Sequence, residues 1–224
     1  MKKVTIQWLG HSCFKLTWDD WSAVLDPYQD GSVPGLDNLQ VSAIDVFCSH
    51  GHYDHGAAEV VKQIKMAAPA PKITRVNSFH DNENGAKRGE NIIRVFDFDG
   101  FKVAHFGDLG HILNDEQISR IGNVDVALLP VGGFYTIDAP TAKKVAQQVK
   151  AKVIIPMHYR TDKFGFDVIS TLDEFTKLYD DVVYTDSDTV VYTGKDAAEA
   201  GQGTDGGDKD ALAKVLVLVP AMVK

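Results

Sequence analysis

Three histidines and an aspartate lie close together in the run His50-Gly51-His52-Tyr53-Asp54-His55. The run follows a short apolar strand predicted over 44–48 and precedes a helix predicted over 56–66. His50 and His52 project to the same side of an extended chain and can share one ion. Asp54 and His55 come after the chain has turned, and can reach a second ion. Because Zn²⁺, Mn²⁺ and Fe²⁺ take imidazole and carboxylate ligands, the run predicts a metal site on a loop held between rigid elements.

Two metal ions need more ligands than one loop supplies, and further candidates stand just beyond predicted strands. They are His80, Asp108 and His158. Several strand ends can converge at one edge of the sheets, which would bring these side chains to the first loop. His105 competes with His80, but it lies inside a predicted strand on the same side as Val103. The alternation of that strand directs His105 into or behind the sheet and favours His80, although the sequence alone leaves the choice open.

The order of the predicted elements indicates a protein with two sheets. Alternating apolar residues over 4–18 predict one hairpin, and Asp99-Gly100 predicts the turn of another between strands at 92–98 and 101–106. Helices are predicted over 56–66, 115–121, 140–150 and 168–179, and strands at 182–184 and 190–192 close the pattern. Runs of strands punctuated by single helices, twice over, predict an α/β fold of two sheets with helices outside them.

The chain is expected to divide into one domain and a tail. Residues 1–194 carry every predicted ligand and form the domain, whereas 195–210 are rich in Gly, Ala and Asp and predict a flexible linker. Residues 211–224 contain the apolar run 215–219, which could dock as a strand or a helix on this chain or on a neighbour. The sequence leaves that choice open.

The charge and the cysteines narrow the class of protein. Lys and Arg number 23 and Asp and Glu number 31, so the net charge of −8 argues against nucleic-acid binding. A small anionic substrate stays compatible, because bound dications reverse the local field. Cys13 and Cys48 form no CxxC motif, and neither a signal peptide nor an apolar span of about 20 residues is visible. We expect a cytoplasmic protein that acts on a small molecule without a membrane partner; a homo-oligomer stays open.

The motif order, HxHxDH followed by a histidine, Gly-Asp and a histidine after a late strand, resembles the metallo-β-lactamase superfamily. A narrower resemblance, to a branch of metal-dependent hydrolases akin to the ascorbate-6-phosphate lactonases, rests on five segments. They are Gly10-His11-Ser12-Cys13-Phe14, Ser78-Phe79-His80-Asp81, His105-Phe106-Gly107-Asp108-Leu109-Gly110-His111, Pro130-Val131-Gly132-Gly133 and Pro156-Met157-His158-Tyr159. The resemblance covers about residues 4–193 and implies a four-layer αβ/βα sandwich.

The resemblance also implies how the ligands divide between two divalent ions, most simply Zn²⁺, with Mn²⁺ or Fe²⁺ as alternatives. His50, His52 and His80 would hold the first ion; Asp54, His55 and His158 would hold the second; Asp108 would bridge them. Such a pair can hold a hydroxide that attacks an ester, lactone or phosphodiester bond of a small molecule. Lactamases proper carry a cysteine ligand where this chain has Asp108, so β-lactam hydrolysis is not expected.

Other residues are candidates for catalysis or substrate contact. Asp54 could orient the hydroxide and carry a proton, and His11 and His111 could contact the substrate or donate a proton. Four more side chains that could bind an anionic group are Arg88, Tyr135, Tyr159 and Arg160. The alternatives to a hydrolase are a di-iron redox protein on the same scaffold and a non-catalytic metal-binding protein. A redox protein of that kind usually has a carboxylate in place of His52 and a flavin-binding partner domain.

Overall fold

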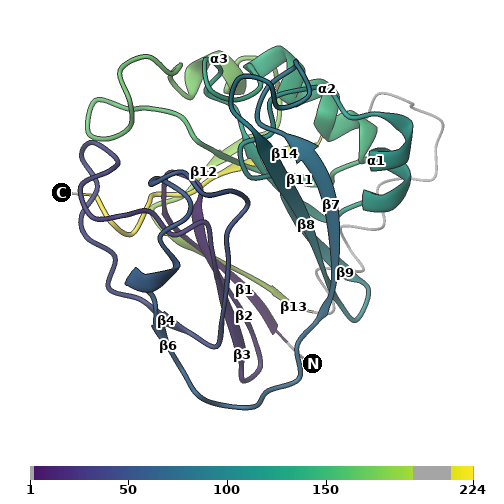
Figure 1. Ribbon diagram of the computed structural model, residues 1–224. Helices are drawn as coiled ribbons and strands as arrows, with labels where there is room; N and C mark the ends of the chain where they lie inside the picture. The colour runs from purple at the N-terminus through teal and green to yellow at the C-terminus, as the bar shows by residue number, and fades with distance from the viewer. Residues whose placement is uncertain (1–2, 194–212, 224) are drawn as a thin grey trace.

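Two β-sheets pack face to face in the computed structural model, which describes residues 3–193 and 213–223 (Figure 1). The first sheet contains, in spatial order, β13 (Thr189–Thr193), β1 (Lys3–Gly10), β2 (Cys13–Trp18), β3 (Trp21–Leu25) and β5 (Asp45–Phe47). The second contains β12 (Val182–Tyr184), β14 (Lys214–Val217), β11 (Val153–Met157), β10 (Val126–Pro130), β9 (Phe101–His105), β8 (Glu90–Phe98) and β7 (Lys72–Phe79). Both sheets are mixed, so the predicted fold class is confirmed.

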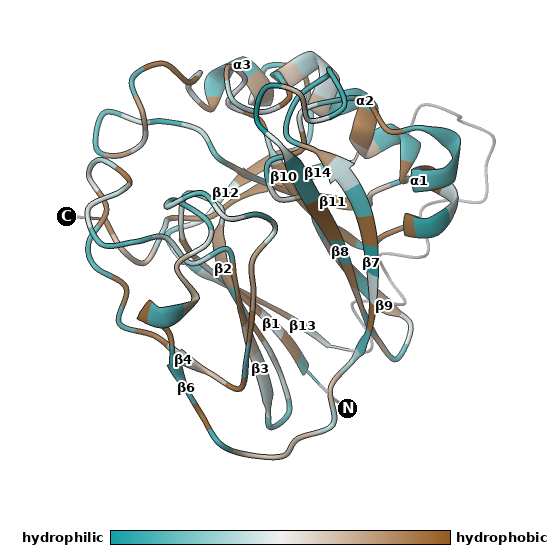
Figure 2. Cartoon of the chain, in the orientation of Figure 1, coloured by the Kyte–Doolittle hydropathy of each residue, from teal (hydrophilic) through white to brown (hydrophobic). Residues whose placement is uncertain are grey.

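The core lies between the sheets, where aromatic side chains of one sheet meet those of the other. The ring of Trp18 lies 5.7 Å from that of Phe98, and the ring of Phe101 lies 4.9 Å from that of Tyr192. Figure 2 shows apolar segments along the central strands of the second sheet, where every residue of β10 is buried. Burial of each large side chain stabilises the fold by about 2 kcal/mol, so the strands that carry the candidate ligands are firmly held.

Both predicted hairpins are confirmed. In the first, β1 and β2 pair with Trp8 opposite Phe14, and the turn between them holds His11 in a left-handed conformation at φ 52°. In the second, Phe98 of β8 pairs with Phe101 of β9 around Asp99 and Gly100, both at positive φ. A two-residue turn with positive φ at both positions matches the right-handed twist of the strands.

The helix predicted over 56–66 is wrong. A 3-10 turn, Ala58–Val60, is followed by β6 (Lys62–Gln63), which pairs with β4 (Ser42–Ala43) beside the first sheet. Of the predicted apolar helical face, Val61 is buried and Val60 packs against the core, but Ile64 is 40% exposed. With only part of its apolar face buried, a short helix has too little to offset its nucleation cost, and the segment takes the edge pairing instead.

The described residues contain three α-helices, all beside the second sheet, on the side away from the first (Figure 1). Helix α1 (Asp115–Ile121) has its predicted bounds and begins with a capping box between Asn114 and Gln117. Helix α2 (Ala139–Gln148) is close to its predicted bounds and is capped by Asp138. The predicted helix over 168–179 shrinks to α3 (Asp173–Thr176). None of these helices is long and apolar enough to cross a bilayer.

The segment Lys214–Val217, part of the apolar run at 211–224, forms a central strand of the second sheet. Strand β14 lies between β11 and β12 and runs parallel to both. Val215, Leu216, Val217 and Leu218 are buried in the core. The linker predicted at 195–210 lies outside the described residues, so the division into domains stays a prediction.

Candidate metal centre

The predicted ligands meet at one edge of the sandwich, where five connecting segments converge. These are the β1–β2 turn with His11, the loop after β5 with 50–55, and the segments directly after β7, β9 and β11 with His80, Asp108 and His158. Strands end here because the residues that follow turn the chain; His158, at φ 53°, and Gly107, at φ 54°, are both left-handed. Each ligand thus stands within three residues of a packed strand, except for the loop that carries 50–55.

Asp108 lies at the centre of the cluster and is almost completely buried. Its Oδ1 is 3.1 Å from His55 Nε2, and its Oδ2 is 3.0 Å from His80 Nε2 and 3.3 Å from His158 Nε2. His50 Nε2 is 4.0 Å away. Burial would raise the pKa of Asp108, but His158 and His55 hold it well below its usual range, so the carboxylate is ionised.

The remaining ligands fall into two groups on either side of Asp108. One group contains His50, His52 and His80. The other contains His11, Asp54, His55 and His158, with His11 Nε2 3.3 Å and His55 Nε2 3.5 Å from Asp54 Oδ2. Apart from His11, this division is the one that the resemblance implied. A third group, of Asp26, His50 and His55, joins the two.

The distances in the cluster fit metal coordination. With bonds of about 2.1 Å, neighbouring ligand atoms on one ion lie about 3.0 to 3.4 Å apart. The contacts from Asp108 to His55, His80 and His158 fall in that range, as does that from His11 to Asp54. Several buried ligand atoms also have no hydrogen-bond partner: His50 Nε2, His55 Nε2, His158 Nε2 and Asp108 Oδ1. Buried polar atoms rarely stay unsatisfied, so the residues present fit metal ions.

Hydrogen bonds behind the cluster direct the imidazoles. Ser49 Oγ donates to Asp26 Oδ2 at 2.6 Å and therefore accepts from His50 Nδ1 at 2.9 Å. His55 Nδ1 donates to the same Asp26 oxygen at 2.9 Å. In both histidines the proton is held on Nδ1, so the lone pair of Nε2 faces Asp108 and is free to bind an ion. Burial, followed by His55, lowers the pKa of His50 to about 3, which keeps that ring neutral.

Nothing in the sequence singles out Asp26, Ser49 or Asn91 as parts of the site. Asn91 Oδ1 accepts from the backbone N–H of Asp108, while Asn91 Nδ2 donates to Ser78 Oγ and to the carbonyl of Phe106. Gly107 permits this, because a Cβ there would lie 2.3 Å from Asn91 Oδ1. An aspartate at a strand end and a buried asparagine inside β8 were the only available signals.

The structure brings His80, and not His105, into the cluster. His105 Nε2 donates to the carbonyl of Ser12 at 2.9 Å, on the far side of β9, as the strand alternation predicted. His111, proposed from the sequence as a catalytic residue, is not brought there either. Its Nε2 accepts from the N–H of Phe79 at 3.1 Å and its Nδ1 donates to the carbonyl of Ile112. Both ring nitrogens are engaged, and His111 fixes the segment that carries His80.

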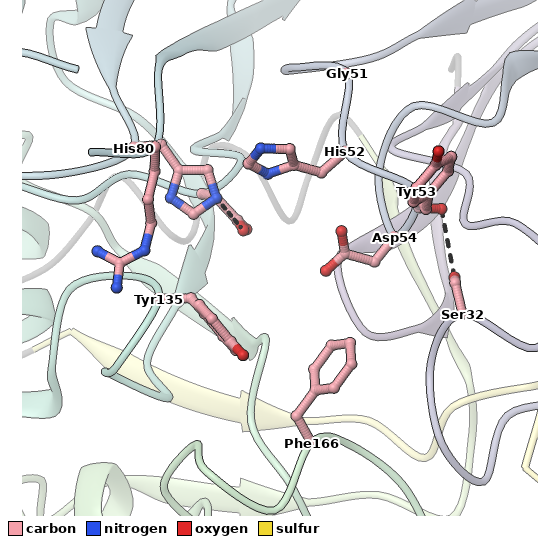
Figure 3. Close-up of a pocket in the computed structure, with 10 residues that line it drawn as sticks. Ser32, Gly51, His52, Tyr53, Asp54, His80, Tyr135 and Phe166 are labelled. Atoms are coloured by element: carbon pink, nitrogen blue, oxygen red, sulfur yellow. Dashed lines mark hydrogen bonds and ion pairs between the residues drawn. The ribbon is translucent and has the colours of Figure 1, made fainter. Parts of the chain in front are cut away.

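A cleft of about 680 Å³ opens on one side of the cluster (Figure 3). It is lined by Ser32, Gly51, His52, Tyr53, Asp54, His80, Arg88, Asp108, Tyr135 and Phe166. Two of the four predicted substrate contacts, Arg88 and Tyr135, line the cleft. The other two do not, because Tyr159 is buried against Trp8 and Arg160 Nε donates to the carbonyl of Ile169. Ser32 and Phe166 also line the cleft, and the sequence did not predict them as substrate contacts.

The cleft reaches the two ligand groups unequally. His52 and His80 line it, whereas His11, His55 and His158 are completely buried behind them. Of the second group only Asp54 faces the cleft, and Figure 3 shows its carboxylate between His52 and Phe166. A substrate therefore meets the His50, His52 and His80 group first.

The comparison with known families agrees with this geometry. Residues 5–158, which span the strands from β1 to β11, match the beta-lactamase superfamily domain. The chain belongs to this superfamily. Within the superfamily it belongs to the UPF0173 metal-dependent hydrolases, since it is 32% identical to a member from Methanoregula boonei over 70% of this chain and 82% of that protein. A member from Thermoplasma volcanium is 28% identical over 74% of this chain and 86% of its own length.

Solved structures of the superfamily share the fold. A protein from Thermotoga maritima, named as a candidate Zn-dependent hydrolase of the metallo-beta-lactamase superfamily, is 33% identical and superposes with a TM-score of 0.68 over 96% of this chain and 98% of that one. The metallo hydrolase Igni18 from Ignicoccus hospitalis is 22% identical, with a TM-score of 0.59 over 97% and 96% of the two chains. The second likeness supports the fold alone.

Proposed function

We propose that the protein is a dinuclear metal-dependent hydrolase that cleaves an ester, lactone or phosphodiester bond of a small molecule. The observation that carries this is the position of Asp108, a carboxylate that lies 3.0 to 3.3 Å from histidines of both groups, His80 of the first and His55 and His158 of the second. A single ion would leave one of these groups unsatisfied in a buried site. Zn²⁺ suits the imidazole and carboxylate donors, with Mn²⁺ or Fe²⁺ as alternatives.

Two such ions, when bound, supply a hydroxide at neutral pH and polarise the bond that it attacks. The residues of the chain position this chemistry. Asp54 faces the cleft and orients the nucleophile, and the buried His11 donates from Nε2 to Asp54 Oδ2 at 3.3 Å and so positions that carboxylate. The ring of Phe166 meets the ring of His11 edge-on, with the centroids 5.5 Å apart, and excludes water from that side of His11. The substrate binds from the His52 and His80 side, where the cleft is open.

The site also bears on the alternatives. His52 stands where a di-iron redox protein usually has a carboxylate, and the cluster keeps the complete set of ligands that a hydrolase needs. The kinship with ascorbate-6-phosphate lactonases stays a prediction from sequence motifs. A cysteine ligand is not available, since Cys13 lies inside the core; this supports a substrate other than a β-lactam.

Elemental analysis of untagged protein tests the paired site. We expect about two transition ions per chain after incubation with Zn²⁺, and about one or fewer in Asp108→Asn. Asp125→Asn is the matched control, because Asp125 is also a buried carboxylate but pairs with Lys152 at the opposite end of β10. Near-zero metal in the wild type would overturn the proposal. If two ions bind, a panel of chromogenic esters, lactones and phosphodiesters follows, and turnover of none would exclude the hydrolase reaction.

A further inference from the structure

We propose that Arg88 binds an oxyanion, a carboxylate or phosphate group, at the end of the substrate away from the bond that is cleaved. This rests on the proposed function and names the class of substrate that the cleft takes. Arg88 lines the cleft together with His52, His80 and Asp108. It is half-buried, and within residues 3–193 and 213–223 no carboxylate lies within ion-pair distance of its guanidinium.

Arg88 differs from the other described arginines in that it lines the cleft, while its neighbour Lys87 pairs with Glu83 on the surface. The guanidinium of Arg88 instead lies over the ring of Tyr135, 5.7 Å from its centroid. Stacking on the ring holds the guanidinium plane while leaving its edge donors free for an oxyanion.

The backbone fixes Arg88 relative to the metal ligands. Asp81, the residue after His80, accepts the N–H groups of Glu83, Gly85, Lys87 and Arg88 at 2.7 to 2.9 Å. The loop over 81–89 therefore cannot move without moving His80. Gly110 closes the other side, since its backbone packs so tightly on Asp81 that a Cβ would lie 2.3 Å from Asp81 N. A cation held at a fixed place beside a metal site sets the length of the molecule that can bridge the two.

Tyr135 is positioned just as firmly. It follows Gly133 and Phe134, which are both left-handed, at φ 63° and 54°. A phenylalanine in that region is strained by about 1 kcal/mol or more, a cost that the hydrogen bonds of the surrounding turn must offset, since Phe134 itself is exposed. Phe166 meets the ring of Tyr135 edge-on at 6.0 Å (Figure 3). The wall of Tyr135 and Phe166 can take the apolar middle of the substrate.

Charge in the cleft favours an anion once the ions are present. Asp54 and Asp108 are the only acidic residues that line it, and both lie among the metal ligands. Two dications outweigh these carboxylates, and Arg88 adds a further positive charge at a distance from the reacting bond. A volume of about 680 Å³ suits a small molecule that reaches from the ions to Arg88.

Matched esters test the site. The 4-nitrophenyl monoester of adipic acid ends in a carboxylate, the 4-nitrophenyl ester of heptanoic acid ends in a methyl group of similar size, and a phosphonate-ended analogue provides the phosphate arm. With zinc-loaded protein we expect Arg88→Gln to raise KM for the anionic esters about 10- to 100-fold, the worth of a hydrogen bond to a charged group. KM for the neutral ester should change less than about twofold.

Lys87→Gln is the control, because it removes the same charge from the adjacent residue, whose side chain pairs with Glu83 on the surface. If Lys87→Gln and Arg88→Gln change KM alike, or if the wild type does not prefer the anionic esters, the proposal is wrong. Calorimetry with acetate and glutarate distinguishes a failure of the anion-site proposal from a failure of the hydrolase proposal. Tighter binding of glutarate than of acetate, lost in Arg88→Gln, supports the anion site even if no ester is cleaved; equal binding overturns it.

Discussion

At the scale of single residues, the metal centre depends on Asp26, a carboxylate that lies behind the predicted ligands. Asp26 accepts from Ser49 and from His55, and through Ser49 it also fixes the ring of His50. One buried group thus sets the tautomer of a histidine in each ligand group. Asp26 therefore links the two ligand groups through hydrogen bonds.

We expect Asp26→Asn to weaken zinc binding about 10- to 100-fold while the protein stays folded. The amide has a single acceptor oxygen, so it cannot accept from the N–H and Oγ of Ser49 and from His55 Nδ1 together; whichever way it turns, the support of His50 through Ser49 or of His55 is weakened. Competition with a chromogenic chelator measures the affinity. Asp45→Asn is the control, since Asp45 accepts from Trp21 in the same sheet, far from the ligands; wild-type affinity in Asp26→Asn would refute the argument.

The sequence predicted the ligands better than the residues that support them. The spacing of the HxHxDH run predicts the ligands His50, His52, Asp54 and His55. Strand alternation distinguishes His80 from His105. Asp26 and Asn91 have no local pattern, because their partners lie 23 or more and 13 or more residues away along the chain. Only the folded sheets bring them to the ligands.

At the scale of elements, the turns after β7 and β9, the two strands on either side of β8, are packed backbone against backbone. The segment after β9, which carries Asp108, touches the segment after β7, which carries His80, at Gly110. The N–H of Gly110 also donates to the carbonyl of Phe79 at 2.9 Å. The same scale explains the wrong helix over 56–66: apolar spacing favours a helix only where the whole apolar face is covered, and here Ile64 stays 40% exposed although Val61 is buried.

We predict that Gly110→Ala lowers the stability by about 1 to 3 kcal/mol or more and weakens zinc binding, because a Cβ would meet Asp81 N at 2.3 Å and His80 C at 2.4 Å. Gly51→Ala should change stability by less than about 0.5 kcal/mol, since nothing lies within 4 Å of its Cβ position, although Gly51 stands between two ligands. Urea unfolding with bound zinc compares the two. Equal effects would show that the contact at Gly110 does not matter.

At the scale of the whole molecule, a strand from beyond the matched region 5–158 completes the sheet that carries half the site. Strand β14 pairs with β11, whose end holds His158, and buries four apolar residues. The order of strands along the sequence could not predict this insertion, because the apolar run at 215–219 was equally compatible with docking on another chain.

Val215→Ala should cost about 2 kcal/mol and lower the melting temperature by a few degrees, since Val215 is completely buried beside β11. Val219→Ala removes the same atoms from a residue that is 47% exposed, and should cost well under 1 kcal/mol. Thermal denaturation followed by circular dichroism measures both. A similar loss in both variants would mean that β14 contributes little to the core.

The place of β14 also bears on how the chain is made. A ribosome adds every metal ligand, from His11 to His158, before it adds Lys214–Val217. Until then one side of β11 offers unpaired N–H and carbonyl groups, which is the kind of edge on which strands of other chains aggregate. During synthesis, the segment bearing His158 is therefore the part of this protein most in need of protection, and docking of β14 ends that exposure.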